Sequence, residues 1–362
     1  MKILGIESSC DETAASVIAD DNGRICVLSN IIASQIKEHT LYGGVVPEIA
    51  ARSHVEKIDI VIKEALSKAG VSLDEIDGIA ATSGPGLIGG VMVGLLSAKA
   101  LCVGTGLPLL AVNHLEGHAL SPRLSEKVDF PYLLLLVSGG HCQILKVEDV
   151  GQYQRLGTTI DDALGECFDK VAKILGLGYP GGPLVEAAAK FGDEKRFELP
   201  RPLIGRAGCD FSFAGLKTAV LRLVEKLCEN GEKLKTQDIN DICASFQNTI
   251  TKVLINRLAN AFAMSGLKSA DCRLVLAGGV AANQFIREKL IEYCTQNSWQ
   301  FFAPEMRFCG DNGAMIALVG LEKLKIGDIA PIDIAPRPRW PLDQNSDPIA
   351  IKNGWGKKGA KS

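Results

Sequence analysis

The sequence predicts an α/β protein built from two similar domains. The chain has 362 residues, which exceeds the size at which a single hydrophobic core usually stops growing. Short apolar runs of strand length alternate with longer stretches of helical periodicity, a pattern typical of α/β folds. A strand, a turn of small and polar residues and a returning strand occur near the start of each half. Such a recurrence indicates an internal duplication.

The first half begins with two predicted strands around a polar turn and continues with alternating helices and strands. Apolar residues recur at helical spacing after residue 45, and a Gly- and Ala-rich helix follows the turn Ser83–Gly86. The predicted strands are Lys2–Glu7, Ala14–Ala19, Gly78–Thr82 and Leu109–Val112, and the predicted helices are Val45–Ala69 and Leu87–Val103.

The opening pattern returns in the second half. Strands Tyr132–Val137 and His141–Val147 flank the tight turn Ser138–Gly140, and Arg273–Leu276 is a further strand before a glycine turn and a helix. After Ile329, the residues Pro331, Pro336, Pro338 and Pro341 impose an extended path. We expect a first domain over 1–112, completed by the helix and extended segment 325–342. A second domain over 113–324 carries an insertion at about 179–240, and 343–362 form a mobile tail.

Composition and charge place the chain among ordinary soluble proteins. Hydrophobic residues make up 47% and charged residues 22% of the sequence, and the net charge is −3. That charge argues against strong non-specific binding of nucleic acid by the whole surface. The eleven cysteines form no Cys-x-x-Cys pair, which is typical of reduced, buried thiols. No signal-peptide pattern is present, and the apolar stretch Leu87–Val112 is interrupted by Lys99 and Pro108. We expect a cytoplasmic protein with no membrane partner.

Three glycine-rich turns follow predicted strands. Backbone N–H groups can converge at such turns without interference from a Cβ atom, and they then bind anions. One turn, Ala277–Asn283, also opens a helix, whose dipole favours a phosphate. Any single turn is explained equally well by hairpin geometry, but three in matching contexts favour a nucleotide. Since no Walker pattern occurs, we expect binding in the manner of the actin-like sugar-kinase and chaperone fold, between two duplicated domains.

Two of the five histidines, His114 and His118, stand four residues apart. On a helix such residues share a face, so both imidazoles can reach one ion. Asp311, far along the chain, could complete the site, since imidazole and carboxylate ligands suit zinc or iron. The alternatives are that the histidines only pack a helix and that Asp311 is an N-cap. A metalloprotease is disfavoured, because Glu116 comes two residues after His114, about 200° around a helix.

Motifs along residues 1 to about 342 match one family in order. The matching segments are Gly5–Thr13, Gly43–Glu48, Ser83–Leu87, Asn113–His118, Leu136–His141, Asp161–Ala163, Phe168–Lys170, Tyr179–Pro183, Phe211–Lys217, Ala277–Asn283 and Asp311–Met315. With these segments the chain closely resembles the universal tRNA adenosine threonylcarbamoyltransferases, whose bacterial members form the TsaD family. The departures are Cys142 and Cys167, where the family has Thr and Ala.

The resemblance implies an actin-like fold of two ribonuclease H-like domains and an acyltransferase activity. A threonylcarbamoyl group would pass from threonylcarbamoyl-AMP to the N6 amine of adenosine 37, beside the anticodon of tRNAs that read codons starting with A, and AMP would be released. The substrate is a mixed anhydride with a good leaving group, so no protein nucleophile is required. The adenine amine is a poor nucleophile, so positioning and carbonyl polarisation must supply most of the acceleration.

The resemblance also implies roles for individual residues. One divalent metal ion per subunit, iron(II) ahead of zinc, would be held by His114, His118 and Asp311. Asp11 and Glu12 are candidates for removing a proton from the amine, and Glu12 could equally be a simple turn residue. The residues expected to bind the adenylate are Leu136, Val137, Ser138, Gly139, Gly140, Asp169, Gly182 and Asn283. For Asp169 the alternative is a surface ion pair with Lys170.

Partners are implied as well. The family works on tRNA together with a shorter actin-like paralogue of the TsaB type and a P-loop ATPase of the TsaE type. Local basic clusters, around Lys190–Arg206 and at Arg337 and Arg339, could contact tRNA phosphates, whereas Lys217 could do so or merely be solvated. Two other functions stay open at this point: a small-molecule kinase of the actin-like superfamily and a non-catalytic nucleotide-binding scaffold.

Overall fold

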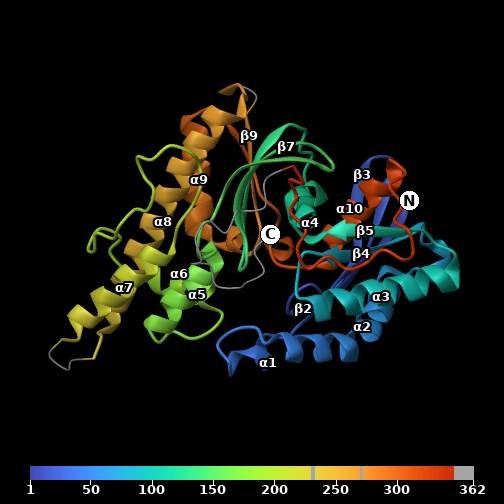
Figure 1. Cartoon of the computed structure of the whole chain (residues 1–362), viewed down its shortest axis with the longest axis horizontal. Helices are drawn as coiled ribbons and strands as arrows, with labels where there is room; N and C mark the ends of the chain where they lie inside the picture. Colours follow the sequence, from blue (N-terminus) through green and yellow to red (C-terminus); the bar gives the residue numbers. More distant parts are fainter. Residues whose placement is uncertain (230–232, 270–271, 346–362) are drawn as a thin grey trace. The chain divides into compact units, whose positions relative to one another are not determined.

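The computed structural model describes residues 1–229, 233–269 and 272–345, and it divides into two compact units (Figure 1). Unit 1 comprises Met1–Asp129, Asp149–Tyr153 and the described residues from Ala303 onward, and unit 2 comprises the described residues of Phe130–Glu148 and Gln154–Phe302. Each unit contains one five-stranded sheet covered by helices. The predicted α/β class is therefore confirmed.

The sheet of unit 1 has the order β3-β2-β1-β4-β5. Strand β1 pairs antiparallel with β2 and parallel with β4, and β4 pairs parallel with β5. The strands are β1 (Lys2–Glu7), β2 (Glu12–Asp21), β3 (Arg24–Ser34), β4 (Gly78–Gly84) and β5 (Leu109–Asn113). The helices are α1 (Ile36–Thr40), α2 (Pro47–Ala69), α3 (Ile88–Thr105), α4 (His114–Leu120) and α10 (Gly313–Lys325), with short 3-10 turns at Leu73–Glu75, Ser121–Leu124 and Met306–Phe308.

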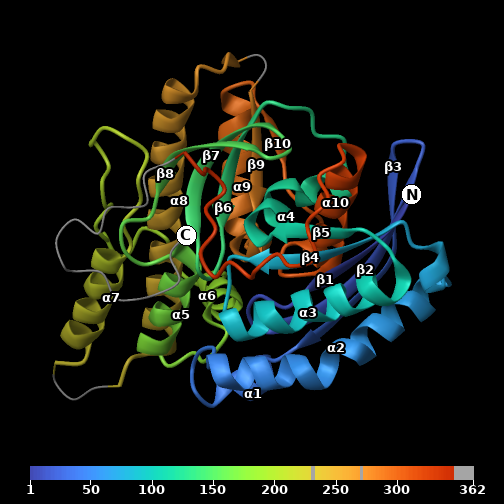
Figure 2. The same cartoon turned by 45° about the vertical axis from the view of Figure 1, so that its right-hand side comes forward.

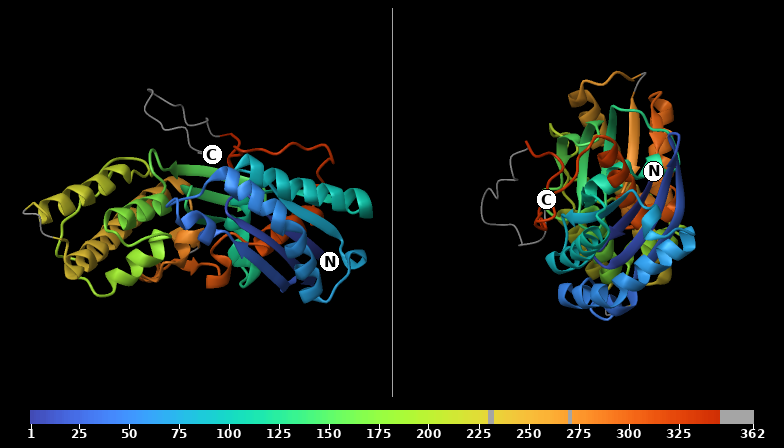
Figure 3. Two further views of the ribbon diagram at one scale, coloured as in Figure 1. Left: turned by 90° about the horizontal axis from the view of Figure 1, so that it is seen from below. Right: turned by 90° about the vertical axis from the view of Figure 1, so that its right-hand side faces the viewer.

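The two faces of this sheet are covered by different helices (Figure 2). Leu4 and Ile6 point to one face, where they join a buried cluster with Val61 of α2 and Leu95 of α3, and these two helices lie side by side (Figure 3). Gly5, between them in the strand, faces α10. A Cβ atom at Gly5 would lie 2.3 Å from the carbonyl oxygen of Gly313, so the missing side chain is what admits the helix.

The sheet of unit 2 repeats this plan. Its order is β10-β9-β6-β7-β8, and β6 pairs antiparallel with β7 and parallel with β9, as β1 does with β2 and β4. The predicted internal duplication is therefore confirmed. The strands are β6 (Tyr132–Val137), β7 (Cys142–Asp149), β8 (Gln152–Thr158), β9 (Arg273–Ala277) and β10 (Gln300–Phe302). The helices are α5 (Leu164–Ile174), α6 (Gly181–Ala189), α7 (Ala214–Leu227), α8 (Thr236–Ser265) and α9 (Gln284–Gln296), with a 3-10 turn at Gly279–Ala282.

The limits of the units differ from the predicted domains in one respect. Residues 113–129, 149–153 and 303–324, expected in the second domain, belong to unit 1. The reason is that α4 and α10 pack on each other and α10 packs on β1, a long-range contact that the sequence order hides. The predicted insertion 179–240 contains α6 and α7. Of the predicted mobile tail, residues 346–362 lie outside the described residues.

Helix α3 is the one described helix that is long and apolar enough to cross a membrane, with a mean hydropathy of 1.6. A single such helix is weak evidence for a membrane segment, because core helices of soluble proteins meet the same criteria. Within unit 1, Val91, Leu95 and Ala98 are buried.

Candidate metal and nucleotide sites

The two histidines lie on α4, which begins directly after strand β5. The side chain of Asn113 accepts a hydrogen bond from the N–H of Leu115 and so starts the helix. His114 and His118 are consequently one turn apart, both buried, with ring centroids 4.8 Å from each other. Gly117 between them lies against α10, where an added Cβ would approach Ile316 and Met315 to about 3 Å. The absence of a side chain there lets α10 lie close to the histidines.

Asp311 comes from the segment before α10. Its Oδ1 lies 3.0 Å from Nε2 of His118 and 3.5 Å from Nε2 of His114, and one ligand atom from each of the three residues lies within 4.8 Å of the others. Ligand atoms about 2.1 Å from a shared ion are about 3 to 4 Å apart, so the two separations from Asp311 suit a divalent metal, and the widest separation of the group would have to shorten slightly. The N-cap of α10 is Asn312, not Asp311, which leaves the Asp311 carboxylate for other contacts.

Glu7, which the sequence analysis did not single out, lies behind His114. It is fully buried at the end of β1, and its Oε2 is 2.9 Å from Nδ1 of His114. Burial opposes ionisation of Glu7, but the charge and hydrogen bond of His114 outweigh it, so the pKa of Glu7 is lowered. Burial would lower the pKa of His114, but the carboxylates of Asp311 and Glu7 raise it to about 9.

Asp11 and Glu12 add further acidic groups to this region. Burial raises the pKa of Glu12 well above its usual value, and the carboxylates of Asp311, Asp11 and Glu7 raise it further. These mutual effects show that the four carboxyl groups lie near one another. An acidic cluster around two imidazoles is stabilised by a cation, which agrees with the ligand distances.

A buried polar network, also missed from the sequence, supports the turn that carries Asp11. Nε2 of His54 lies 3.1 Å from the carbonyl oxygen of Cys10, and its Nδ1 lies 2.8 Å from the Thr13 hydroxyl and 3.4 Å from Nε2 of Gln35. The backbone N–H of Gln35 donates to the carbonyl oxygen of Asp11. Burial lowers the pKa of His54, so a neutral imidazole holds the turn. A lone histidine on a helix gave no signal for this role in the sequence.

Unit 2 contains a separate cavity of about 230 Å³. It is lined by four predicted residues with their neighbours, and an added Cβ atom at Gly139, Gly182 or Gly279 would meet no protein atom within 4 Å. The glycines thus leave room for a ligand beside the backbone. The lining residues are Gly139, Gly165, Phe168, Asp169, Pro180, Gly182, Pro183, Glu186, Gly279, Val280, Ala282 and Asn283.

The remaining predicted nucleotide residues differ in their placement. Leu136 and Val137 are fully buried in β6, and Ser138 and Gly140 do not line the cavity. Of the residues that line the cavity, Asp169 also stabilises the start of α6, because its Oδ1 accepts a hydrogen bond from the N–H of Gly181. Asn283 caps α9 through Oδ1.

Ion pairs hold two lysines of unit 2. Lys170 pairs with Asp162 at 2.8 Å and Glu166 at 2.7 Å. Lys217 also pairs with Asp162, at 3.3 Å, so Lys217 is not simply solvated.

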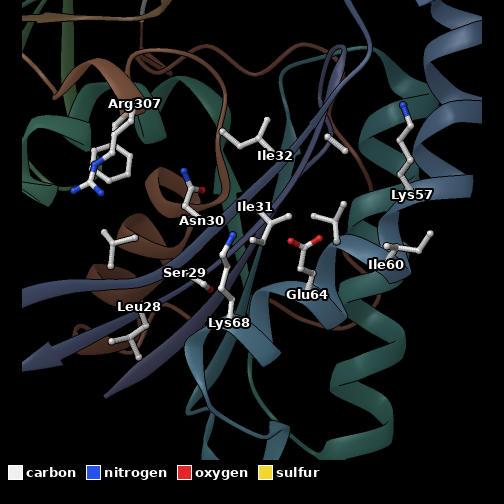
Figure 4. A pocket seen from close by; sticks show the side chains of 14 residues that line it. Leu28, Ser29, Asn30, Ile31, Ile32, Lys57, Ile60, Glu64, Lys68 and Arg307 are labelled. Atoms are coloured by element: carbon white, nitrogen blue, oxygen red, sulfur yellow. The ribbon is translucent and has the colours of Figure 1, made fainter.

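The largest cavity, about 800 Å³, lies elsewhere in unit 1, along β3 and α2 (Figure 4). Aliphatic side chains such as Ile31, Ile32 and Ile60 dominate its lining, with Lys57 and Glu64 from α2. It contains none of the predicted site residues, and Lys57 is paired with Glu38. Size alone does not make it the functional site.

Comparison with known proteins identifies the family of the chain. Residues 26–318 match the sequence model of the family described as "TsaD: tRNA N6-adenosine threonylcarbamoyltransferase". Proteins named tRNA N6-adenosine threonylcarbamoyltransferase from Sinorhizobium medicae and Rhizobium meliloti are 55% and 54% identical to this chain, and each alignment covers 100% of both proteins. The crystal structure of full-length HypF in the phosphate- and nucleotide-bound form has a TM-score of 0.56 at 16% identity. That alignment covers 89% of this chain and 46% of HypF, and it supports the actin-like fold alone. The chain belongs to the TsaD family of tRNA N6-adenosine threonylcarbamoyltransferases.

Proposed function

We propose that the chain transfers a threonylcarbamoyl group from threonylcarbamoyl-AMP to the N6 amine of adenosine 37 in tRNAs that read codons beginning with A. The proposal rests on the family and above all on one observation, the group of the buried His114 and His118 with the half-buried Asp311. In the reaction a bond forms between N6 and the carbamoyl carbon, the bond from that carbon to the phosphate oxygen breaks, and AMP leaves. The amine loses one proton.

His114, His118 and Asp311 would hold one divalent metal ion, iron(II) in our proposal, with zinc as the alternative. When bound, the ion supplies Lewis acidity that polarises a carbonyl group. The chain itself keeps the site dry, since both histidines are buried, and it fixes the ligands on α4 and before α10. Asp11 and Glu12 are the proposed acceptors of the amine proton. Burial and the neighbouring carboxylates raise the pKa of Glu12, and a bound cation would offset the effect of the carboxylates.

Unit 2 would bind the adenylate. The glycines of its cavity admit a ligand to the backbone, and Gly139 belongs to the turn after β6, where N–H groups can donate hydrogen bonds to a phosphate. Asp169, Gly182 and Asn283 line the same cavity and are proposed to hold the ribose and base. Leu136, Val137, Ser138 and Gly140 would contribute through the backbone of that turn.

The chain would work in the cytoplasm with partners. A TsaB-type paralogue and a TsaE-type ATPase are proposed to complete the tRNA-binding surface and to reset the enzyme, because the net charge of −3 gives the chain little general attraction to RNA. Purified alone, the chain should modify tRNA only weakly.

The test mixes the chain with these partners, unmodified tRNA and synthetic threonylcarbamoyl-AMP, without ATP, and measures modified adenosine by nucleoside mass spectrometry. Modified adenosine that disappears in His114→Ala supports the proposal. Intact adenylate and no product would contradict it. Rapid ATP turnover stimulated by a small alcohol or acid would indicate a kinase instead, and full function in the His114→Ala, His118→Ala double variant would indicate a scaffold.

A further inference from the structure

Glu7 receives hydrogen bonds from three directions. Its Oε1 accepts the backbone N–H of Ser9 at 2.5 Å, and its Oε2 accepts the Thr82 hydroxyl at 2.6 Å. Nδ1 of His114 lies 2.9 Å from the same Oε2. The side chain is fully buried, and a buried carboxylate is stable only when such donors surround it.

These contacts determine which nitrogen of His114 carries a proton. An ionised carboxylate can only accept hydrogen bonds, so Nδ1 must donate to Glu7. The Ser9 hydroxyl, 3.1 Å from Nδ1, can share that proton as a second acceptor. The proton therefore resides on Nδ1, and the lone pair of a neutral His114 resides on Nε2.

Nε2 of His114 faces Oδ1 of Asp311 at 3.5 Å. Oδ1 of Asp311 can accept a hydrogen bond from a protonated Nε2, and when that proton is absent the Nε2 lone pair and Oδ1 can both bind one cation. This is the arrangement in which a carboxylate behind a histidine orients the ring and raises its strength as a metal ligand.

We propose that Glu7 is a positioning residue for the metal site, acting through His114 by holding its proton on Nδ1 and its Nε2 towards the ion. The proposal rests on the proposed function, because it assumes that His114 is a ligand. Thr82 and Ser9 hold Glu7 in place, so β1, β4 and the turn after β1 all contribute to orienting one ring. Glu7 makes no contact of its own with the ligand position.

His118 provides an internal contrast. Its Nδ1 is buried and has no hydrogen-bond partner among the described residues, whereas its Nε2 lies 3.0 Å from Asp311. Among the described residues, no carboxylate bonds to Nδ1 of His118 in the way that Glu7 bonds to Nδ1 of His114. The orientation of the site consequently depends on Glu7 to an unusual degree.

The experiment titrates the purified full-length chain with zinc(II) by calorimetry and compares three forms. Glu7→Gln should bind zinc about 10- to 100-fold more weakly than the unaltered chain, because a carboxamide presents a donor to one of the groups that now donate to Glu7. Glu75→Gln is the matched control, since Glu75 forms an exposed pair with Lys2, and it should bind zinc normally. AMP binding by unit 2 should be unchanged in both variants.

Zinc affinity of Glu7→Gln equal to that of the unaltered chain would overturn the inference and leave the proposed function standing. No zinc binding by the unaltered chain, or equal binding by His114→Ala, would overturn the metal site itself. If Glu7→Gln does not fold, nitrogen-15 histidine spectra of the unaltered zinc-bound chain decide the question. A His114 ring protonated at Nδ1 and ligated through Nε2 supports the role of Glu7, and ligation through Nδ1 overturns it.

Discussion

The two units use the same sheet order, but the turns after their first strands carry opposite chemistry. In unit 1 the turn between β1 and β2 contains the buried Ser8 and Ser9 and leads to the acidic pair Asp11 and Glu12. In unit 2 the turn between β6 and β7 contains the exposed Gly139 and Gly140. The first turn concentrates negative charge beside two histidines, and the second leaves backbone N–H groups accessible.

This difference shows how a duplicated scaffold can bind two unlike groups. Carboxylates and imidazoles suit a cation, whereas a bare glycine turn suits a phosphate. The strand pairing that positions both turns is the same. In our proposal, side chains at a few turn positions, and not the topology, therefore decide which ligand each unit takes.

The largest effect is expected from Asp311→Asn, which removes the carboxylate shared by both histidines. Loss of metal polarisation should reduce threonylcarbamoyl transfer by about 100-fold or more. The measurement is the rate of modified-adenosine formation under single-turnover conditions. Transfer at the rate of the unaltered chain would mean that the acidic site of unit 1 has no role in the chemistry.

The second effect concerns unit 2, where Gly182→Ala should fill ligand space. No protein atom lies within 4 Å of the added Cβ, and Gly182 is in the first turn of α6, so stability should not fall. AMP affinity should fall by about tenfold, equivalent to about 1.4 kcal/mol, as measured by calorimetry.

Gly278→Ala is the contrasting change for the same cavity. Gly278 has a φ of 92°, and its Cβ would lie 2.4 Å from the carbonyl oxygen of Val137. This variant should unfold at a lower temperature, because its free energy of unfolding should fall by about 1 to 3 kcal/mol. If Gly182→Ala and Gly278→Ala have the same effect on stability and on AMP affinity, the cavity is not reserved for a ligand.

A third prediction tests the polar network around His54, which supports the turn that carries Asp11. Burial lowers the pKa of His54, so the unfolded chain binds a proton at this residue more readily than the folded chain does. The stability it contributes is present above the ordinary pKa of 6.5 and is lost as the pH falls below it. His54→Gln should lessen this loss between about pH 7.5 and about pH 5.5, as measured by urea denaturation. An unchanged pH dependence would exclude His54 as its source.

The smallest effect is expected from Ser138→Ala, in the turn of unit 2. Its hydroxyl accepts the N–H of His141 at 3.1 Å, and this half-buried contact is worth about 1 kcal/mol. Thermal unfolding should detect the change, and AMP affinity should be nearly unaffected because Ser138 does not line the cavity. A large loss of AMP affinity would give the side chain a direct role.

The sequence predicted the duplication, the helix Pro47–Ala69 and the pairing of His114 with His118, because each depends on local periodicity or short spacing. It could not reveal Glu7, since a strand residue gives no sign of which histidine it meets 107 positions later. Nor could it reveal that α10 packs on β1, which depends on the matched glycines Gly5 and Gly313. The strand β3 was missed because its polar residues interrupt the apolar pattern.

The central claim is that unit 1 binds the cation and unit 2 binds the nucleotide at separate sites. The most direct test measures zinc and AMP binding by calorimetry for Asp311→Asn and Gly182→Ala. We predict that Asp311→Asn loses zinc and keeps AMP, and that Gly182→Ala shows the reverse. Loss of both ligands in either variant, with the fold intact, would contradict the claim.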